Sequence, residues 1–168
     1  MTRAMVVMGV TGSGKSTLAH ALAQALGWHF VEGDSLHPAA NLAKMAAGQA
    51  LNDADRRPFL ENVARVIAQT PAPGVVVSCS ALKRSYRDQI RTGDPGVLFV
   101  LPVLTRQSLQ ARLSGRSGHF MPASLLDSQL AILEPPQPDE SSVRIDGEAH
   151  TEVQVRQALA TAQAMGLL

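Results

Sequence analysis

The sequence has little cysteine, no long apolar run and no cluster of like charges. Its single cysteine, Cys79, cannot form a disulfide within the chain or a zinc site of several cysteines, which suits a reducing compartment. No stretch approaches the roughly eighteen apolar residues that a membrane-spanning helix needs. A glycine-rich loop already begins at residue 9, which leaves no room for a secretory signal. These absences predict a cytoplasmic protein without a membrane partner.

The charges are nearly balanced, with 15 Lys and Arg against 14 Asp and Glu and a formal net charge of +1. Because the basic residues are dispersed along the chain, no nucleic-acid partner is expected. Apolar residues make up 45% and charged residues 17% of the sequence, which is a globular composition. The length of 168 residues predicts a single domain over residues 1–168.

Short apolar segments alternate with segments of helical periodicity along the chain. The predicted strands are residues 4–8, 28–32, 74–80, 97–103 and 143–146. The predicted helices are residues 16–26, 39–47, 55–68, 82–91, 106–113, 124–133 and 152–165. Strands and helices that alternate in this way predict a three-layer α/β fold with a central parallel sheet of about five strands.

Residues 9–16 match the phosphate-binding pattern G-x-x-x-x-G-K-S/T at every fixed position. Backbone N–H groups and the positive end of the following helix can surround phosphate oxygens. Lys15 is expected to bridge the β- and γ-phosphates, and the Ser16 hydroxyl to ligate Mg²⁺. The sequence therefore predicts ATP and Mg²⁺ as cofactors, while the acceptor stays open between water, a protein and a metabolite. The predicted nucleotide-binding residues here are Gly9, Val10, Thr11, Gly12, Ser13, Gly14, Lys15, Ser16 and Thr17.

Two carboxylates follow the second predicted strand, at Glu32 and Asp34. Ligands of parallel α/β proteins bind at the carboxyl ends of the strands. Asp34 is placed to orient or deprotonate an acceptor hydroxyl, and Glu32 to hold a magnesium-bound water. The alternative is that both side chains only cap the next segment.

Further along the chain, five blocks of sequence carry a family resemblance. They are D-S-L-H-P at 34–38, K-M at 44–45, L-N-D-A-D-R-R-P-F-L at 51–60, C-S-A-L-K-R-S-Y-R-D at 79–88 and G-H-F-M-P at 118–122. In this order the blocks resemble those of the bacterial and eukaryotic gluconokinases of the thermoresistant type. The family often has Asp in place of Glu32 and Trp in place of Phe59, so the chain departs from the pattern at these two positions.

The resemblance implies a P-loop kinase fold related to shikimate and nucleoside monophosphate kinases. It implies transfer of the γ-phosphoryl group of ATP to the 6-hydroxyl of D-gluconate, and it suggests a homodimer. Of the residues that it implies for the acceptor site, Asp53 could instead favour a helix N-terminus, Arg56 could be solvated and His37 could be a helix cap. The implied acceptor-site residues are Asp34, His37, Lys44, Asp53, Arg56, Ser80, Lys83, Arg87, His119 and Gln129.

Residues 114–122 are polar and punctuated by glycine, which predicts a mobile lid. Arg112 and Arg116 flank this lid, and one or both could contact phosphates after closure, with Arg116 predicted to be catalytic and Arg112 to bind the nucleotide. Each could also be a solvated helix residue. Phe120 is expected to act as a hydrophobic latch.

Two other functions compete with this interpretation. The first is another small-molecule kinase of the same fold, such as a shikimate kinase, and the block at 51–60 speaks against it. The second is a P-loop ATPase or switch, which should carry an aspartate at the end of an apolar strand as a separate magnesium anchor. The strand at 74–80 ends in Ser78, Cys79 and Ser80 without an acidic residue, which disfavours the switch.

Overall fold

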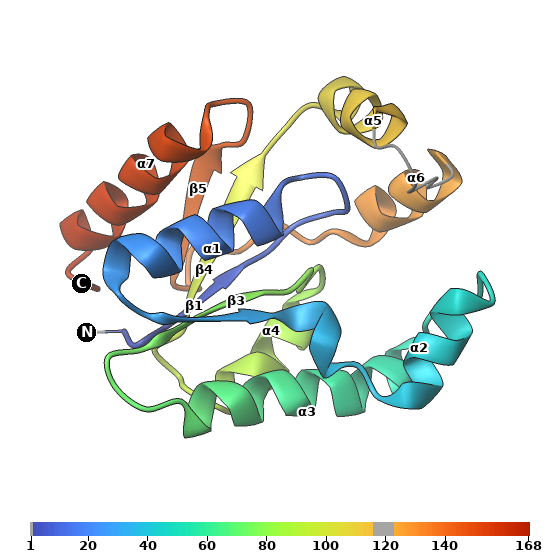
Figure 1. Ribbon diagram of the computed structural model, residues 1–168, viewed down its shortest axis with the longest axis horizontal. Coiled ribbons are helices and arrows are strands. Elements are labelled where there is room, and N and C mark those ends of the chain that lie inside the picture. Colours follow the sequence, from blue (N-terminus) through green and yellow to red (C-terminus); the bar gives the residue numbers. More distant parts are fainter. Residues whose placement is uncertain (1, 116–122) are drawn as a thin grey trace.

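The centre of the molecule is a sheet of five parallel strands in the order β2-β3-β1-β4-β5 (Figure 1). The computed structural model describes residues 2–115 and 123–168. The sheet confirms the predicted parallel α/β architecture. Its strands are β1 (Ala4–Val7), β2 (His29–Glu32), β3 (Val75–Ser78), β4 (Leu98–Val103) and β5 (Ser142–Asp146).

Helices cover both faces of the sheet. On one face α1 (Lys15–Leu26) packs beside α7 (Thr151–Ala164), and on the other α3 (Asp53–Gln69) packs beside α4 (Arg84–Arg91). The side chains of β1 alternate between the two resulting cores because successive residues of a strand point to opposite faces. Central strands with both faces covered are apolar throughout, as the fully buried β1 and β3 illustrate.

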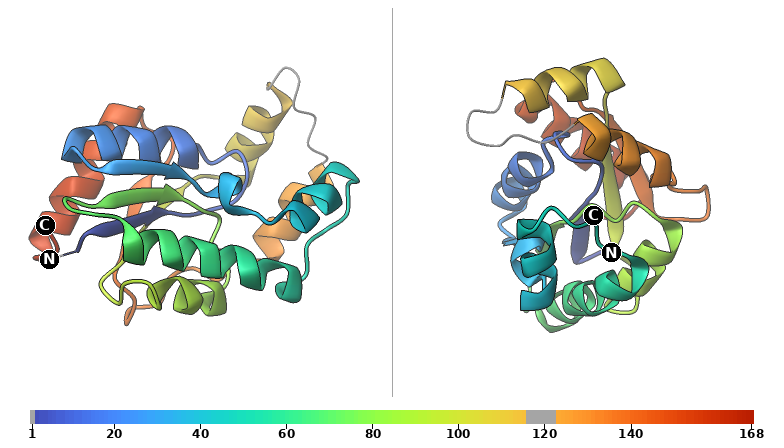
Figure 2. Two further views of the ribbon diagram at one scale, coloured as in Figure 1. Left: turned by 60° about the horizontal axis from the view of Figure 1, so that its bottom comes forward. Right: turned by 90° about the vertical axis from the view of Figure 1, so that its right-hand side faces the viewer.

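The remaining helices lie beyond the carboxyl ends of the strands, where they frame the site. They are the short 3₁₀ helix η1 (Gly33–Leu36), α2 (Ala39–Ala46), α5 (Arg106–Ser114) and α6 (Ala123–Ile132). Figure 2 shows α2 and α6 at the same end of the molecule. A third apolar cluster, which includes Val10, Leu82 and Leu126, joins α5 and α6 to the phosphate loop.

Two helices begin two residues away from the positions that the sequence predicts, whereas the other helices begin within one residue of them. Helix α3 begins at Asp53 rather than at residue 55, because the Asn52 side chain accepts from the Asp55 amide while the Asp55 carboxylate accepts from the Asn52 amide. Helix α4 begins at Arg84 rather than at residue 82, because Ala81 has a φ of 45° and the backbone at Lys83 is extended. The 3₁₀ helix η1 was not predicted.

Most of the predicted lid, residues 116–122, lies outside the described residues. No helix within residues 2–115 and 123–168 combines the length and apolar character that crossing a membrane requires.

Candidate active site

The phosphate loop connects β1 to α1 through backbone conformations that favour glycine. Gly12 and Gly14 have φ values of 80° and 82°, a backbone conformation that side chains rarely adopt. Gly14 is the N-cap of α1, where no side chain caps the helix and no acidic residue lies in the first turn. The amides at this helix end can therefore bind an anion. The Lys15 ammonium donates to the Val10 carbonyl oxygen at 3.0 Å, close against the loop.

The carboxylate of Glu32 is held at the end of β2 by the neighbouring strand. Its Oε1 accepts from the Ser78 hydroxyl at 2.6 Å, and that hydroxyl oxygen accepts from the Gly33 amide at 3.2 Å. A side chain at position 33 would collide with the Ser78 carbonyl oxygen, so the close approach of the two strand ends requires glycine. This approach directs both Glu32 and Asp34 toward the same opening.

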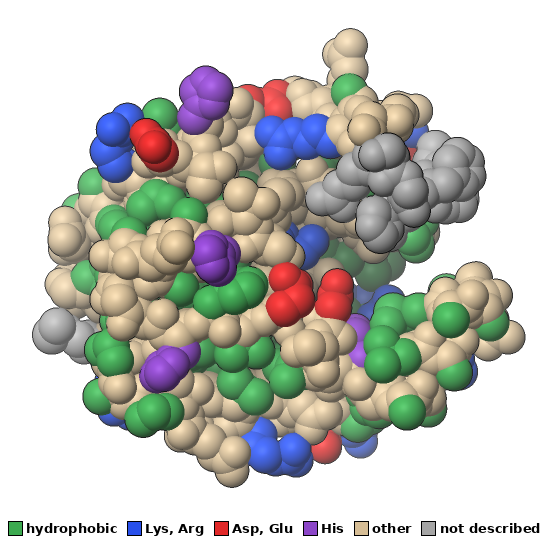
Figure 3. Space-filling view, in the orientation of Figure 1, with side chains coloured by type: hydrophobic (Ala, Val, Ile, Leu, Met, Phe, Trp, Pro, Cys, Tyr) green, Lys and Arg blue, Asp and Glu red, His purple; other side chains and the backbone are tan. Residues whose placement is uncertain are grey.

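A cavity of about 980 Å³ runs from the phosphate loop to α2 and α6. Figure 3 shows acidic side chains beside a hollow on this face of the molecule. The cavity brings most of the predicted nucleotide and acceptor residues together, although they come from distant parts of the sequence. Of the predicted residues it is lined by Thr11, Gly12, Gly14, Lys15, Ser16, Thr17, Glu32, Asp34, His37, Arg56, Ser80 and Gln129.

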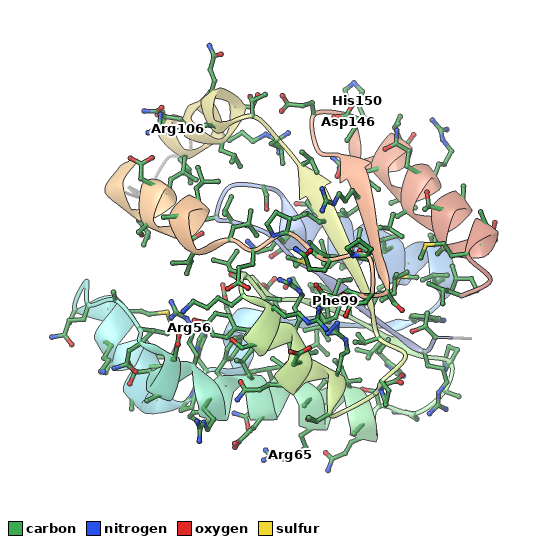
Figure 4. The ribbon with its side chains drawn as sticks, turned by 180° about the vertical axis from the view of Figure 1, so that it is seen from behind. Arg56, Arg65, Phe99, Arg106, Asp146 and His150 are labelled. Carbon is green, nitrogen blue, oxygen red and sulfur yellow. The ribbon has the colours of Figure 1, made fainter. Side chains whose placement is uncertain are left out.

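Arg56 enters this cavity from α3 beside the phenol of Tyr86, and Figure 4 shows where its side chain lies. An Arg56 guanidinium nitrogen donates to the Tyr86 oxygen at 3.2 Å, and the Tyr86 hydroxyl donates to Asp53 at 2.5 Å. The Lys83 ammonium donates to the same carboxylate at 3.3 Å. These bonds, from Tyr86 first and Lys83 second, lower the pKa of Asp53. Asp53 and Lys83 do not line the cavity but hold Tyr86 at its wall.

His37 stacks on Phe59, with 3.8 Å between the ring centroids and 13° between the planes. Burial lowers the pKa of His37 and the nearby charge of Arg56 lowers it further, while Asp34 opposes both. Because its ordinary pKa is 6.5, this imidazole is neutral at pH 7. His37 is therefore available for hydrogen bonds rather than for charge pairing.

Gln129 ties α6 to the phosphate loop. Its side-chain oxygen accepts from the Thr11 amide at 2.7 Å. The sequence suggested that Gln129 donates to a substrate hydroxyl, and the bond to Thr11 uses the oxygen of this side chain and not its donor group. The amide NH₂ group of this side chain can therefore still donate to a ligand.

Arg112 lines a second, smaller cavity of about 290 Å³. Its guanidinium donates to the Gly147 carbonyl oxygen at 3.0 Å, in the loop between β5 and α7 where Figure 4 labels Asp146 and His150. The Gln154 amide donates to the carbonyl oxygens of Gly147 and Ala149 and fixes the same loop. Gly14 and Thr17 line both cavities, so the two adjoin at the phosphate loop.

Two further predicted acceptor residues do not line the cavity either. Lys44 forms an ion pair with Asp55 at 2.8 Å and does not line the cavity. Arg87 is fully buried and donates to Glu140 at 2.7 Å and to the Ala81 and Leu82 carbonyl oxygens. The prediction of a substrate contact for Arg87 is therefore corrected, because an interior guanidinium with four acceptors can only support the loop at the cavity wall. Arg116, His119 and Phe120 lie outside the described residues.

Sequence reasoning missed three residues that organise the site: Ser78, Tyr86 and Gln154. Tyr86 belongs to the block at 79–88 that carries the family resemblance. Its place in that block was a signal from which a role in the site could have been predicted. Ser78 entered the sequence analysis only because the strand at 74–80 ends without an acidic residue, and no role was predicted for its hydroxyl. Gln154 had no signal, because its partners lie in a loop that only the folded chain places beside it.

The oxygen ligands of the cavity suit magnesium. The hydroxyl of Ser16 and the carboxylate of Glu32 line the same wall, and Mg²⁺ is commonly bound by one or two such groups together with substrate phosphates. Within the part of the chain that the structure describes, no group of three or more His, Cys, Asp and Glu side chains could hold a metal ion alone.

Cys79 lies beside the site but is chemically quiet. Burial raises the pKa of its thiol to about 12, so the thiol is protonated at neutral pH.

Comparison with known proteins agrees with this geometry. A family model described as an AAA domain matches residues 5–136. The gluconokinase of Gluconobacter oxydans is 50% identical over 164 residues, which cover 96% of this chain and 92% of that protein. A crystal structure of a gluconokinase from Sinorhizobium meliloti superposes with a TM-score of 0.88 at 45% identity, covering 96% of this chain and 92% of that one.

A shikimate kinase structure from Aquifex aeolicus covers 98% of this chain and 98% of its own, with a TM-score of 0.62, but is only 15% identical. That likeness concerns the fold alone, whereas the matches to gluconokinases combine high identity with nearly full coverage of both chains. The chain therefore belongs to the AAA-domain family of the matching model and to the gluconokinases.

Proposed function

We propose that this chain transfers the γ-phosphoryl group of ATP to the 6-hydroxyl of D-gluconate and so forms 6-phosphogluconate and ADP. The observation that carries the proposal is the continuous cavity in which the phosphate loop faces the carboxylate of Asp34, the imidazole of His37 and the guanidinium of Arg56. Gluconate has one carboxylate and a row of hydroxyls, so its site needs a cation together with hydrogen-bond donors and acceptors. The cavity wall offers each of these.

On the nucleotide side, the amides of the phosphate loop and the ammonium of Lys15 stabilise the charge of the transferring group. Ser16 and Glu32 are the residues that would hold Mg²⁺, Glu32 through a water molecule. Magnesium, when bound, neutralises phosphate oxygens and orients them for in-line transfer. The base of the nucleotide occupies the smaller cavity between Arg112 and the loop after β5. For Arg116, which the sequence predicts to be catalytic, the proposed role is contact with the transferred phosphate.

On the acceptor side, Asp34 orients the attacking hydroxyl and takes its proton. Arg56 supplies the positive charge for the gluconate carboxylate, with its orientation set by Tyr86. Ser80 and the amide NH₂ of Gln129 line the same wall and can bond to the sugar hydroxyls. Closure of the predicted lid over the bound substrates excludes water from the site, which limits wasteful hydrolysis of ATP.

The proposed enzyme acts on small molecules in the cytoplasm and needs neither nucleic acid nor a membrane. The family resemblance suggests a homodimer. Light scattering coupled to size exclusion would measure the molar mass: twice 17.8 kDa supports the dimer, and 17.8 kDa contradicts it.

An acceptor panel tests the activity. Release of ADP from ATP is measured with magnesium in the presence of gluconate, shikimate, a nucleoside monophosphate or no acceptor. The proposal expects strong stimulation by gluconate alone. Stimulation by another acceptor would keep the kinase and reject gluconate, and hydrolysis independent of any acceptor would indicate an ATPase.

Lys15→Met is the control for this panel. Loss of the ammonium should lower kcat by about 10² to 10³, the usual effect of removing one group that stabilises transition-state charge. An unchanged melting temperature would show that the fold is intact. If the variant kept the full kcat, the activity would belong to a contaminating kinase or to another site.

A further inference from the structure

Asn41 is a buried polar side chain in the described part of α2, exposed by only 3%. Its amide nitrogen lies 2.8 Å from the Asp55 carbonyl oxygen and 3.2 Å from Nδ1 of His37. The three residues come from the segment before α2, from α2 itself and from α3. One amide group therefore connects three parts of the acceptor wall.

The Asp55 carbonyl fixes the orientation of the Asn41 amide. A backbone carbonyl oxygen only accepts hydrogen bonds, so the Asn41 atom that faces it must be the NH₂ group, because the reverse orientation would place two oxygens in contact. The same NH₂ group faces Nδ1 of His37. Nδ1 must then accept, and it must carry a lone pair rather than a proton.

A neutral imidazole has one N–H, so the proton of His37 lies on Nε2. One face of the ring is covered by Phe59, and His37 lines the large cavity. Within residues 2–115 and 123–168, no hydrogen bond to Nε2 is found and no buried side-chain nitrogen or oxygen lacks a partner. Nε2 is therefore accessible from the cavity and presents its N–H there.

The charges around the ring agree with a neutral state. Asp34 faces His37 from η1 and Arg56 faces it from α3, with opposite effects on its pKa. Lys44 on α2 is paired with the Asp55 carboxylate on α3, so these two charges largely offset each other. A second proton on Nδ1 would meet the Asn41 NH₂ group, which is a further cost of protonation.

We propose that Asn41 is a positioning residue that fixes His37 as a neutral imidazole protonated on Nε2, so that His37 donates a hydrogen bond to an oxygen of the acceptor. His37 is then neither the base nor a cation of the site, and the proton of the attacking hydroxyl goes to Asp34. The ligand part of this inference rests on the proposed function, because a hydroxylated carboxylate offers the oxygen that Nε2–H would bind. The tautomer itself does not depend on the acceptor.

The tautomer is measured by ¹H–¹⁵N NMR of the histidine rings in the full chain without ligand. His37 is assigned by the signal lost in His37→Phe. The expected pattern at pH 7 has a protonated Nε2 and an unprotonated Nδ1. A ring protonated on Nδ1, or on both nitrogens at pH 7, would overturn the proposal.

Asn41→Ala removes the fixed donor, and the expected spectrum is a mixture of both tautomers. Asn62→Ala is the matched control, because Asn62 also donates its amide to a backbone carbonyl, that of Leu36 at 2.9 Å, without touching His37. The control should keep the Nε2–H tautomer. If both variants gave the same mixture, general loosening of the segment would explain the effect and Asn41 would have no special role.

Kinetics test the ligand part separately. His37→Phe should raise the KM for gluconate by about tenfold, as expected for one lost hydrogen bond to a polar substrate, and leave the KM for ATP within about twofold. His37→Gln keeps an N–H donor and should recover part of the loss. An unchanged KM for gluconate in His37→Phe would overturn the donor role. If wild-type protein did not phosphorylate gluconate at all, the proposed function would fail while the NMR result still decided the tautomer.

Discussion

Asp34 and His37 line the same cavity wall but differ in what they can do with a proton. His37 has a lowered pKa, and its Nδ1 lone pair is occupied by the Asn41 amide. Asp34 is a carboxylate in η1, just after the end of β2, in the place where α/β proteins bind ligands. Of these two residues, Asp34 is therefore the one that can accept the hydroxyl proton.

Asp34→Asn should lower kcat for gluconate phosphorylation by about 10² to 10⁴, the usual contribution of a general base. Its KM for gluconate should change much less, because the amide keeps the shape and part of the hydrogen bonding. Steady-state kinetics with saturating ATP separate the two constants. A rise in KM with an unchanged kcat would make Asp34 a binding residue instead of the base.

At the scale of elements, a buried ion pair supports the cavity wall. Glu140 accepts from Arg87 and Arg91, and Arg87 also donates to the carbonyl oxygens of Ala81 and Leu82. The Ser80 carbonyl oxygen of this loop accepts from the Gly9 amide at 3.0 Å. The loop after β3 is thereby held against both α4 and the phosphate loop.

Arg87→Met should destabilise the fold by about 3–5 kcal/mol at pH 7. The reason is that Glu140 stays buried but loses its ion pair with Arg87 and keeps the one with Arg91. The urea midpoint of unfolding is the measurement. The double variant Arg87→Met with Glu140→Met should recover much of this loss, since apolar side chains can replace a buried pair. A single variant as stable as wild type would contradict the account.

The same pair predicts a pH dependence. Burial alone would raise the pKa of Glu140, but the hydrogen bonds from Arg87 and the Gln137 amide outweigh it, and the net pKa is lowered from 4.5. A carboxyl with a lowered pKa contributes stability above its unfolded pKa and loses it as the pH falls through the folded pKa. The urea midpoint of wild type should fall more between pH 7 and pH 4 than that of Arg87→Met. Equal losses in the two proteins would contradict this role of Glu140.

The sequence predicted the order of strands and helices because hydrophobic periodicity is local. It also located the phosphate loop, since that motif is contiguous. It could not predict that Arg87 is interior, because its partner Glu140 lies 53 positions along the chain and only folding brings them together. The ion pair of Lys44 with Asp55 could not be predicted for a related reason: a lysine beside acidic residues can face a substrate or a neighbouring helix, and only the packing of α2 on α3 decides.

At the scale of the whole molecule, two cavities meet at Gly14 and Thr17. The larger cavity extends toward α2 and α6, and the smaller toward the loop between β5 and α7. In the proposed function, the nucleotide base and the acceptor bind on opposite sides of the phosphate loop. A substitution in the lining of one cavity should therefore change the KM of one substrate only.

Arg112→Ala should raise the KM for ATP by about tenfold and leave the KM for gluconate unchanged, because the guanidinium lines the smaller cavity and bonds to the Gly147 carbonyl. Arg106→Ala is the matched control on the same helix, since Arg106 forms an exposed ion pair with Asp127 and lines neither cavity. Arg106→Ala should have the same KM values for ATP and for gluconate as the wild type. Equal effects of both variants would indicate damage to α5 rather than a contact with the nucleotide.

The most direct test of the central claim is to identify the product by correlated ³¹P and ¹H NMR after reaction of ATP, magnesium and D-gluconate with the protein. The account predicts one phosphomonoester whose phosphorus couples to the two protons on C6 of gluconate, formed in equal amount with ADP. Inorganic phosphate without any ester, or an ester at another carbon, would contradict it.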